Sequence, residues 1–156
     1  MNIFQEFPDQ TRGRAVLLSI KPKYADMIFS GDKRVELRRT WPTKTNIEVI
    51  VVYASSPVQK LVGLVFVDRI EELKFEELWN LSDANGGGVT YDELKSYTRG
   101  KDKAYGVMID RVESAEVQVA PRTLFPSFTP PQFFLYLKPE EYRLILRAMF
   151  PSKNII

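Results

Sequence analysis

The amino-acid sequence predicts a mixed α+β fold, in which buried strands alternate with short amphipathic helices. Runs rich in valine, isoleucine and leucine are typical of buried strands, and they lie at residues 15–20, 47–54, 59–68 and 104–112. Apolar residues at helical spacing indicate helices at residues 22–29, 71–81 and 139–150. Gly63 lies in the middle of one predicted strand, where a glycine favours a bulge or a sharp bend.

Length and composition restrict the domain organisation and the possible chemistry. With 156 residues the chain is long enough for one domain with a substantial core, so we expect a single domain over residues 1–156. The formal net charge is only +2, so any basic surface must be local. The chain has no cysteine and no histidine, which excludes disulfides, thiolate nucleophiles and a histidine base. We therefore expect no metal and no cofactor.

The sequence indicates neither a membrane span nor a signal peptide. No apolar run approaches the roughly 20 residues of a membrane helix. The first ten residues lack a basic start and an apolar centre, although Phe4 and Phe7 suggest that this segment docks on the body of the protein. We expect a soluble, cytoplasmic protein.

The helix predicted at residues 22–29 has clear signals at both ends. Pro22 suits the first turn of a helix, and Gly31 suits a left-handed residue that ends one. Ala25, Ile28 and Phe29 fall on one face and are expected to pack inward.

A charged strand is predicted directly after this helix, from about Lys33. Its aliphatic residues alternate with Arg34, Glu36 and Arg38, and residues two apart on a strand lie about 7 Å apart, so either arginine can reach Glu36. The pattern fits a solvated face of paired charges, and it equally fits a site for an anionic or carbonyl-bearing ligand. The position of Lys33 at the corner favours the ligand site.

These residues resemble a known family. The pattern Gly-x-Lys-x-x-Glu-x-Arg at Gly31, Lys33, Glu36 and Arg38, preceded by a Leu-Ser-Ile-Lys-Pro segment, resembles the ASCH domains of the PUA-like superfamily. The resemblance extends over about residues 15–112. It implies a small, strongly bent PUA-like β-barrel with flanking helices and a core at about 15–119. Residues 120–156, with the helix that starts at Pro139, would be an added C-terminal extension.

The resemblance leaves three functions open. The first is an RNA- or nucleotide-binding module in RNA metabolism or transcription regulation. The second is a small hydrolase, either a ribonuclease or an amidohydrolase on a modified nucleoside, with Lys33 as general base and Glu36 as the other catalytic residue; burial and neighbouring arginines would lower the pKa of Lys33. The third is a protein-interaction domain without a ligand, with a protein partner or a second copy bound through residues 130–150.

One departure from the family weakens the amidohydrolase reading. In the amidohydrolase-like relatives a threonine lies three residues after the lysine and would be the nucleophile, but Glu36 occupies that position here. Ser55 or Ser56 could replace it only within hydrogen-bond reach of Lys33.

Further candidate ligand-binding residues lie near predicted strand ends. Lys21 would lie near the barrel mouth or merely cover a helix start, and Ser55 and Ser56 could contact a ligand or cap a turn. Arg39 could hold a phosphate. Trp41 could stack on a base, but it could equally cover the core.

A second basic segment precedes the strand at residues 104–112. Lys103 and Tyr105 combine a charge for phosphate with a ring for stacking, and a basic turn with a core tyrosine is the alternative. The three glycines at 86–88 lack the spacing of a phosphate-binding loop. They precede Thr90 and Glu93, which predict a capping box at the start of a helix.

Overall fold

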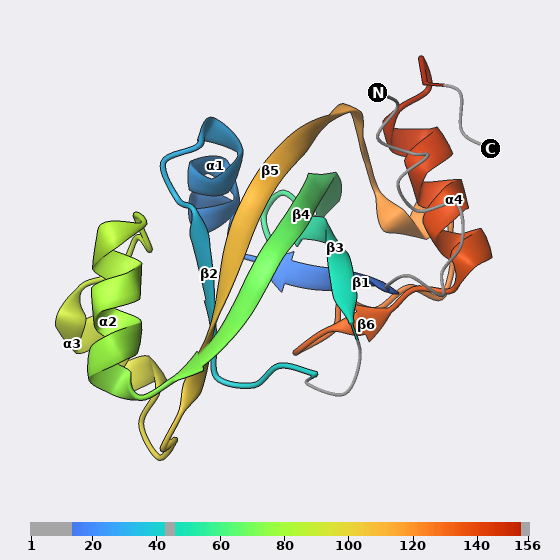
Figure 1. The fold of residues 1–156 in the computed structure, drawn as a ribbon. Coiled ribbons are helices and arrows are strands. Elements are labelled where there is room, and N and C mark those ends of the chain that lie inside the picture. The colour runs from blue at the N-terminus through green and yellow to red at the C-terminus, as the bar shows by residue number, and fades with distance from the viewer. Residues whose placement is uncertain (1–13, 43–45, 154–156) are drawn as a thin grey trace.

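The computed structural model describes residues 14–42 and 46–153 and has the predicted mixed α+β class (Figure 1). The strands are β1 Arg14–Ile20, β2 Val35–Arg38, β3 Ile47–Ala54, β4 Lys60–Leu73, β5 Ala104–Val119 and β6 Leu135–Tyr136. The helices are α1 Pro22–Ser30, α2 Phe75–Ala84, α3 Tyr91–Tyr97 and α4 Pro139–Met149, with a 3₁₀ turn at Pro121–Thr123.

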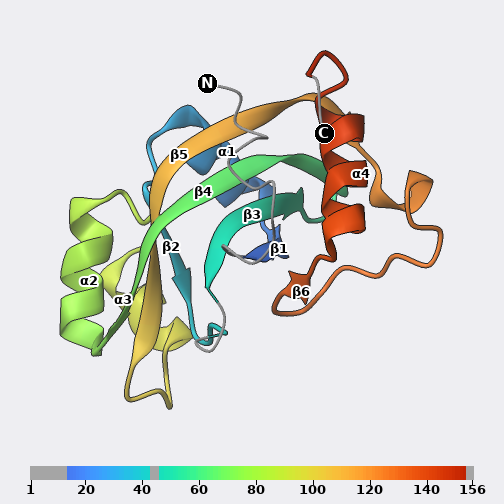
Figure 2. The ribbon, with the colours of Figure 1, turned by 45° about the vertical axis from the view of Figure 1, so that its right-hand side comes forward.

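The six strands form one strongly bent sheet in the order β2-β5-β4-β3-β1-β6. Strand β1 runs parallel to β3, and every other neighbouring pair is antiparallel. Figure 2 shows β3, β4 and β5 arching together across the molecule. In the described part of the chain β2 and β6 each pair on one side only, so this sheet is bent as the resemblance implies but is not closed into a barrel.

The bend has the cause that the sequence predicted. The pairing register shifts between Val52 and Tyr53 on β3, and between Leu61 and Gly63 on β4. A Cβ atom at Gly63 would lie 2.5 Å from a carbonyl oxygen of β5 and 2.6 Å from the ring of Phe29. Only glycine allows the strands and α1 to approach this closely.

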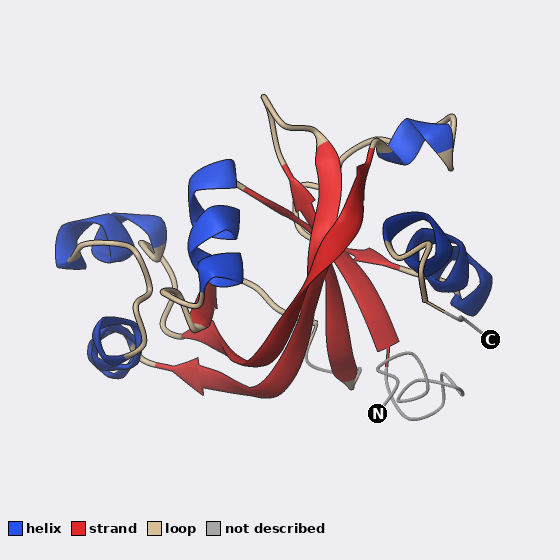
Figure 3. Ribbon diagram, turned by 90° about the horizontal axis from the view of Figure 1, so that it is seen from above, coloured by secondary structure: helices blue, strands red, loops and turns tan. Residues whose placement is uncertain are grey.

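Helices cover both ends of the sheet and leave β1 buried on two faces. Figures 1 and 3 show α2 and α3 at one end and α4 at the other. Because side chains alternate along a strand, Ala15 and Leu17 of β1 pack in the core beneath α4, whereas Val16 and Leu18 pack in the core beneath α1. Burial on both faces explains why the sequence of β1 is almost continuously apolar.

Two strands are longer than the sequence predicted. The strand expected at 59–68 continues to residue 73, so α2 begins at residue 75 rather than 71, and the strand expected at 104–112 continues to 119. Charged residues occupy these extra segments because the two strands extend beyond the core and are half exposed there. Tyr97, the last residue of α3, is 42% exposed although its spacing from Leu94 suits an inward-facing helical position.

Some expectations concern residues outside the described ranges. The docking of Phe4 and Phe7 falls at residues 1–13, and part of the loop before β3 falls at residues 43–45. Among the described residues, no helix is both long enough and apolar enough to cross a membrane.

Candidate functional site

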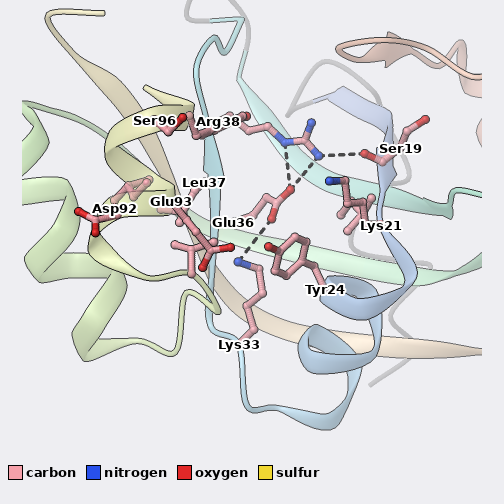
Figure 4. Close-up of a pocket in the computed structure, with 14 residues that line it drawn as sticks. Ser19, Lys21, Tyr24, Lys33, Glu36, Leu37, Arg38, Asp92, Glu93 and Ser96 are labelled. Atoms are coloured by element: carbon pink, nitrogen blue, oxygen red, sulfur yellow. Dashed lines mark hydrogen bonds and ion pairs between the residues drawn. The ribbon is translucent and has the colours of Figure 1, made fainter. Parts of the chain in front are cut away.

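A cleft of about 680 Å³ opens where the end of β1, helix α1, strand β2 and helix α3 meet (Figure 4). Charged side chains line it from both sides, namely Lys21, Lys33, Glu36, Arg38, Asp92 and Glu93. Ile20, Tyr24, Leu37 and Leu94 add apolar surface. Apolar walls with a few converging polar groups are typical of a small-ligand site.

Lys33 lies at the corner between α1 and β2 and is almost fully buried, with 3% of the residue exposed. Its Nζ donates a hydrogen bond to the carbonyl oxygen of Gly87 at 2.5 Å and lies 3.7 Å from Oε1 of Glu36. The ring of Tyr24 lies 5.3 Å from the same nitrogen. The amino group therefore has a fixed position and little contact with water.

Burial lowers the pKa of Lys33 below the ordinary lysine value. The charge of Glu36 and its contact with the amino group oppose this shift, and the charge of Arg38 adds to it. A lysine in this environment releases its proton more readily than one on the surface, which is a requirement for a lysine that acts as a base.

Glu36 connects the two cations. It lies two residues before Arg38 on β2, so both side chains project from the same face of the strand. Arg38 contacts Oε2 of Glu36 through Nε at 3.0 Å and through Nη2 at 2.7 Å, while Lys33 approaches the other carboxylate oxygen (Figure 4). Only 8% of Glu36 is exposed, so the solvated strand face considered from the sequence does not occur here.

Arg38 also joins two strands that are not neighbours in the sheet. Its Nη2 donates to the carbonyl oxygen of Ser19 at 3.1 Å, which joins β2 to the end of β1. The guanidinium Nη1 has no protein partner among the described residues, so it remains able to bind a ligand in the cleft.

The glycine-rich loop after α2 is part of the site, and its role was not predicted. A Cβ atom at Gly86 would lie 2.0 Å from the carbonyl oxygen of Asp32, and one at Gly87 would lie 1.9 Å from Oγ of Ser82. The glycines therefore let the loop pack directly against the corner, where Gly87 accepts the hydrogen bond from Lys33. Three consecutive glycines were a signal of close backbone approach.

The two rims of the cleft differ in charge. Asp92 and Glu93 are exposed on α3, whereas the amino group of Lys21 points toward Glu36 and Arg38 from the opposite side (Figure 4). The predicted capping box of α3 is present, and its hydrogen bonds from Thr90 lower the pKa of Glu93. The α3 rim is therefore negative and the Lys21 rim positive.

The structure brings four predicted site residues together in the cleft: Lys21, Lys33, Glu36 and Arg38. Arg39 instead donates to the carbonyl oxygens of Tyr97 at 2.6 Å and Arg99 at 3.0 Å, and so attaches the end of α3 to β2. Trp41 is 7% exposed and belongs to the core beneath α1, where it also lines a smaller cavity.

The other four predicted site residues do not line the cleft. The amide of Ser55 donates to the carbonyl oxygen of Ile20 at 2.9 Å, which places Ser55 beside the end of β1, and Ser56 is exposed. Lys103 is exposed just before β5. Tyr105 pairs with Arg38 across β5 and β2, and a hydrogen bond with Glu72 raises the pKa of its hydroxyl.

The described residues contain no cluster of three or more Asp, Glu, His or Cys side chains placed to hold a metal ion. The polar groups that line the cleft are instead cations, carboxylates, two phenols and two serine hydroxyls. Such groups can bind an anion, accept a hydrogen bond from the edge of a nucleotide base or transfer a proton.

Known proteins share the fold and part of the sequence. The chain is 25% identical over 138 residues to a protein of Zymomonas mobilis named an ASCH domain-containing ribonuclease, covering 87% of this chain and 90% of that protein. The crystal structure of ASCH from Zymomonas mobilis matches with a TM-score of 0.78 at 23% identity, over 85% of this chain and 94% of that one. This match shows a common fold.

A second similarity is more limited. Over 94 residues the chain is 28% identical to the large ribosomal subunit protein uL22 of Ureaplasma parvum, which covers 60% of this chain but only 30% of that protein. The family model of the ASCH domain matches residues 18–116, which is more than half of the chain. The resemblance expected from the pattern at Gly31, Lys33, Glu36 and Arg38 is thus confirmed, and the chain belongs to the ASCH domain family.

Proposed function

We propose that this protein binds single-stranded RNA, with one nucleotide unit held in the cleft between β1, β2 and α3. The observation that carries the proposal is the buried arrangement of Lys33, Glu36 and Arg38 in a cavity of about 680 Å³. A structural charge network does not require a cavity beside it. Here Arg38 lines the cavity, and its Nη1 has no partner among the described residues.

The charges suit one phosphate and one polar base edge. Lys21 and Arg38 both line the cleft, where they can contact a phosphate group. Glu36 fixes Arg38 and can accept a hydrogen bond from a base amino group. The similarity to a relative named as a ribonuclease supports RNA over other phosphate-bearing ligands.

Labelled RNA at low salt tests this proposal. We expect a fluorescent single-stranded octanucleotide to bind the wild-type protein and to bind the Lys33→Ala/Arg38→Ala double variant much more weakly. The slope of log K against log salt should be about −1.4 to −2.8, as expected for two to four phosphate contacts. Lys153→Ala is the control, because this exposed lysine follows α4, which lies at the opposite end of the sheet from α3 (Figure 1). Equal affinity of the wild type and the double variant would refute the proposal.

RNA cleavage is the second candidate, and the environment of Lys33 favours it. Burial lowers the pKa of this lysine, so its amino group gives up a proton more readily than an exposed lysine does; once neutral, it would accept the proton of a 2′-hydroxyl as that oxygen attacks the adjacent phosphorus. Arg38 would balance the charge that develops on the phosphate oxygens. The 5′-oxygen would leave with a proton from solvent, which gives a 2′,3′-cyclic phosphate and a 5′-hydroxyl. Cleavage that is lost in Lys33→Ala but retained in Lys153→Ala would support this reaction.

The amidohydrolase alternative has less support. It requires a hydroxyl nucleophile next to Lys33 in place of the family threonine, and Ser55 and Ser56 do not line the cleft. Tyr24 does line the cleft, and its ring lies 5.3 Å from Nζ of Lys33, but a phenol is weakly nucleophilic when protonated.

Binding of a protein partner or a second copy through residues 130–150 stays a prediction, as does the single-domain organisation. Helix α4 buries Tyr142, Ile145, Leu146 and Met149 in the core, so most of its apolar face is already covered. Leu135 and Leu144 remain about 40% exposed on this part of the chain.

A further inference from the structure

A second cavity of about 200 Å³ lies next to the cleft, and two residues line both. These shared residues are Arg38 and Tyr97. The cavity is too small for a drug-sized ligand, since the pockets that bind such ligands have volumes of about 300–1,000 Å³. It suits a single planar ring.

Aromatic rings from three separate parts of the chain line this cavity. Trp41 follows β2, Tyr97 ends α3, and Phe133 and Phe134 precede β6. Phe133 is 62% exposed and Tyr97 is 42% exposed, so these two rings are available for stacking. Phe134 packs instead against the core beneath α1.

A buried hydrogen-bond donor without a partner lies in the wall of the cavity. Trp41 is 7% exposed, and its indole Nε1–H makes no hydrogen bond to any residue in the described part of the chain. Because this nitrogen has almost no accessible surface, Trp41 contributes its ring to the wall of the cavity and not its donor.

The wall contributed by residues 131–134 is fixed to the rim of the cleft. Ser19 lines the cleft and donates through Oγ to the carbonyl oxygen of Pro131 at 3.1 Å. The cavity is therefore held beside the cleft by a direct contact between β1 and the segment before β6. Gln132, Phe133 and Phe134 also lie outside the region that matches the family model, residues 18–116.

We infer that this cavity, lined by Trp41, Tyr97 and Phe133, binds the base of the nucleotide adjacent to the one in the cleft. The inference rests on the proposed function. Arg38 lies between the two cavities, so it can contact the phosphate that joins the two nucleotides. Phe133 stacks on the second base, and Trp41 forms part of the wall of the cavity that holds it.

Two matched probes test this second base site. One is uridine 3′-monophosphate, and the other is the dinucleotide UpU with a 2′-O-methyl group on its first ribose, which blocks attack by the 2′-oxygen. We expect the dinucleotide to bind the wild type about tenfold more tightly, since each stacked base adds binding energy of this order. In Phe133→Ala this advantage should fall to about twofold or less, with mononucleotide affinity unchanged.

Two further variants complete the design. Phe133→Leu keeps an apolar side chain but removes the aromatic ring, so it should also weaken binding of the dinucleotide selectively. Leu144→Ala removes a partly exposed apolar side chain on α4 and should change neither affinity.

The outcomes separate this inference from the proposed function. Equal affinities of the wild type for both probes, or an equal loss of both in Phe133→Ala, would overturn the second base site and leave the cleft as a nucleotide site. Failure of both probes to bind the wild-type protein would overturn the proposed function and the second base site with it.

Discussion

Two basic residues at β2 and the corner before it, Lys33 and Arg38, are largely buried, whereas those just before β5 are exposed, although β2 and β5 pair with each other. Lys33 and Arg38 are held against Glu36, and backbone carbonyls of the glycine loop and of β1 fix their nitrogens. Lys101 and Lys103 are exposed, and neither makes an ion pair within the described ranges. The two groups of basic residues have similar local sequence patterns. They differ because a segment distant in the sequence buries the residues at the cleft, whereas the residues before β5 form an ordinary exposed turn.

The largest predicted effect comes from removing the charge that the two cations share. Glu36→Gln leaves Lys33 and Arg38 close together without a buried counter-charge, so we expect a loss of about 3–5 kcal/mol in the free energy of unfolding. Urea denaturation measures this loss.

The matched control for this substitution is Asp68→Asn. Asp68 pairs with Arg69 at 2.8 Å, but the two side chains are 52% and 54% exposed. Exposed pairs contribute about 0–1 kcal/mol, so the control should change stability little. Similar losses in the free energy of unfolding of the two variants would contradict the claim that the buried charges contribute more to stability than the exposed pair.

A smaller effect is expected in the pH dependence of stability. The pKa of Lys33 is lowered in the folded protein, so between that pKa and the ordinary lysine pKa the unfolded chain binds more protons than the folded one. Stability relative to Lys33→Met should therefore rise with pH across this window, by at most about 1.4 kcal/mol per pH unit. Below the lowered pKa the difference between the two proteins should stay constant.

Denaturation of both proteins at a series of alkaline pH values checks this prediction, because titration of all other groups cancels in the difference. Lys103→Met is the control, since it removes an exposed lysine. Its free energy of unfolding should depend on pH as that of the wild type does. A difference between wild type and Lys33→Met that falls as pH rises would refute the pKa direction.

Local signals predicted much of the fold. Pro22 and Gly31 marked the two ends of α1, the apolar run at 47–54 coincided with β3, and the capping box at Thr90 marked the start of α3. These features depend on residues close together in sequence, which is why one sequence was enough to predict them.

The missed features depend on contacts between distant residues. The hydrogen bond from Lys33 to Gly87 joins residues 54 positions apart, and the bridge from Arg38 to Ser19 depends on how far the sheet bends. The charged stretch at 68–72 has helix-forming residues, but pairing with β5 keeps it in a strand. Neither the pairing nor the bend can be read from local spacing.

The most direct test of the RNA site compares two exposed lysines that border the two regions. Lys21 lies on the rim of the cleft and Lys103 lies before β5, and each can be replaced by alanine without removing a buried contact. Binding of a fluorescent RNA octanucleotide is measured as a function of salt. We predict that Lys21→Ala weakens binding and reduces the salt slope by about 0.7, the value for one phosphate contact to a single strand, while Lys103→Ala leaves both unchanged. An unchanged slope in Lys21→Ala together with a reduced slope in Lys103→Ala would place the RNA at β5 and contradict the account.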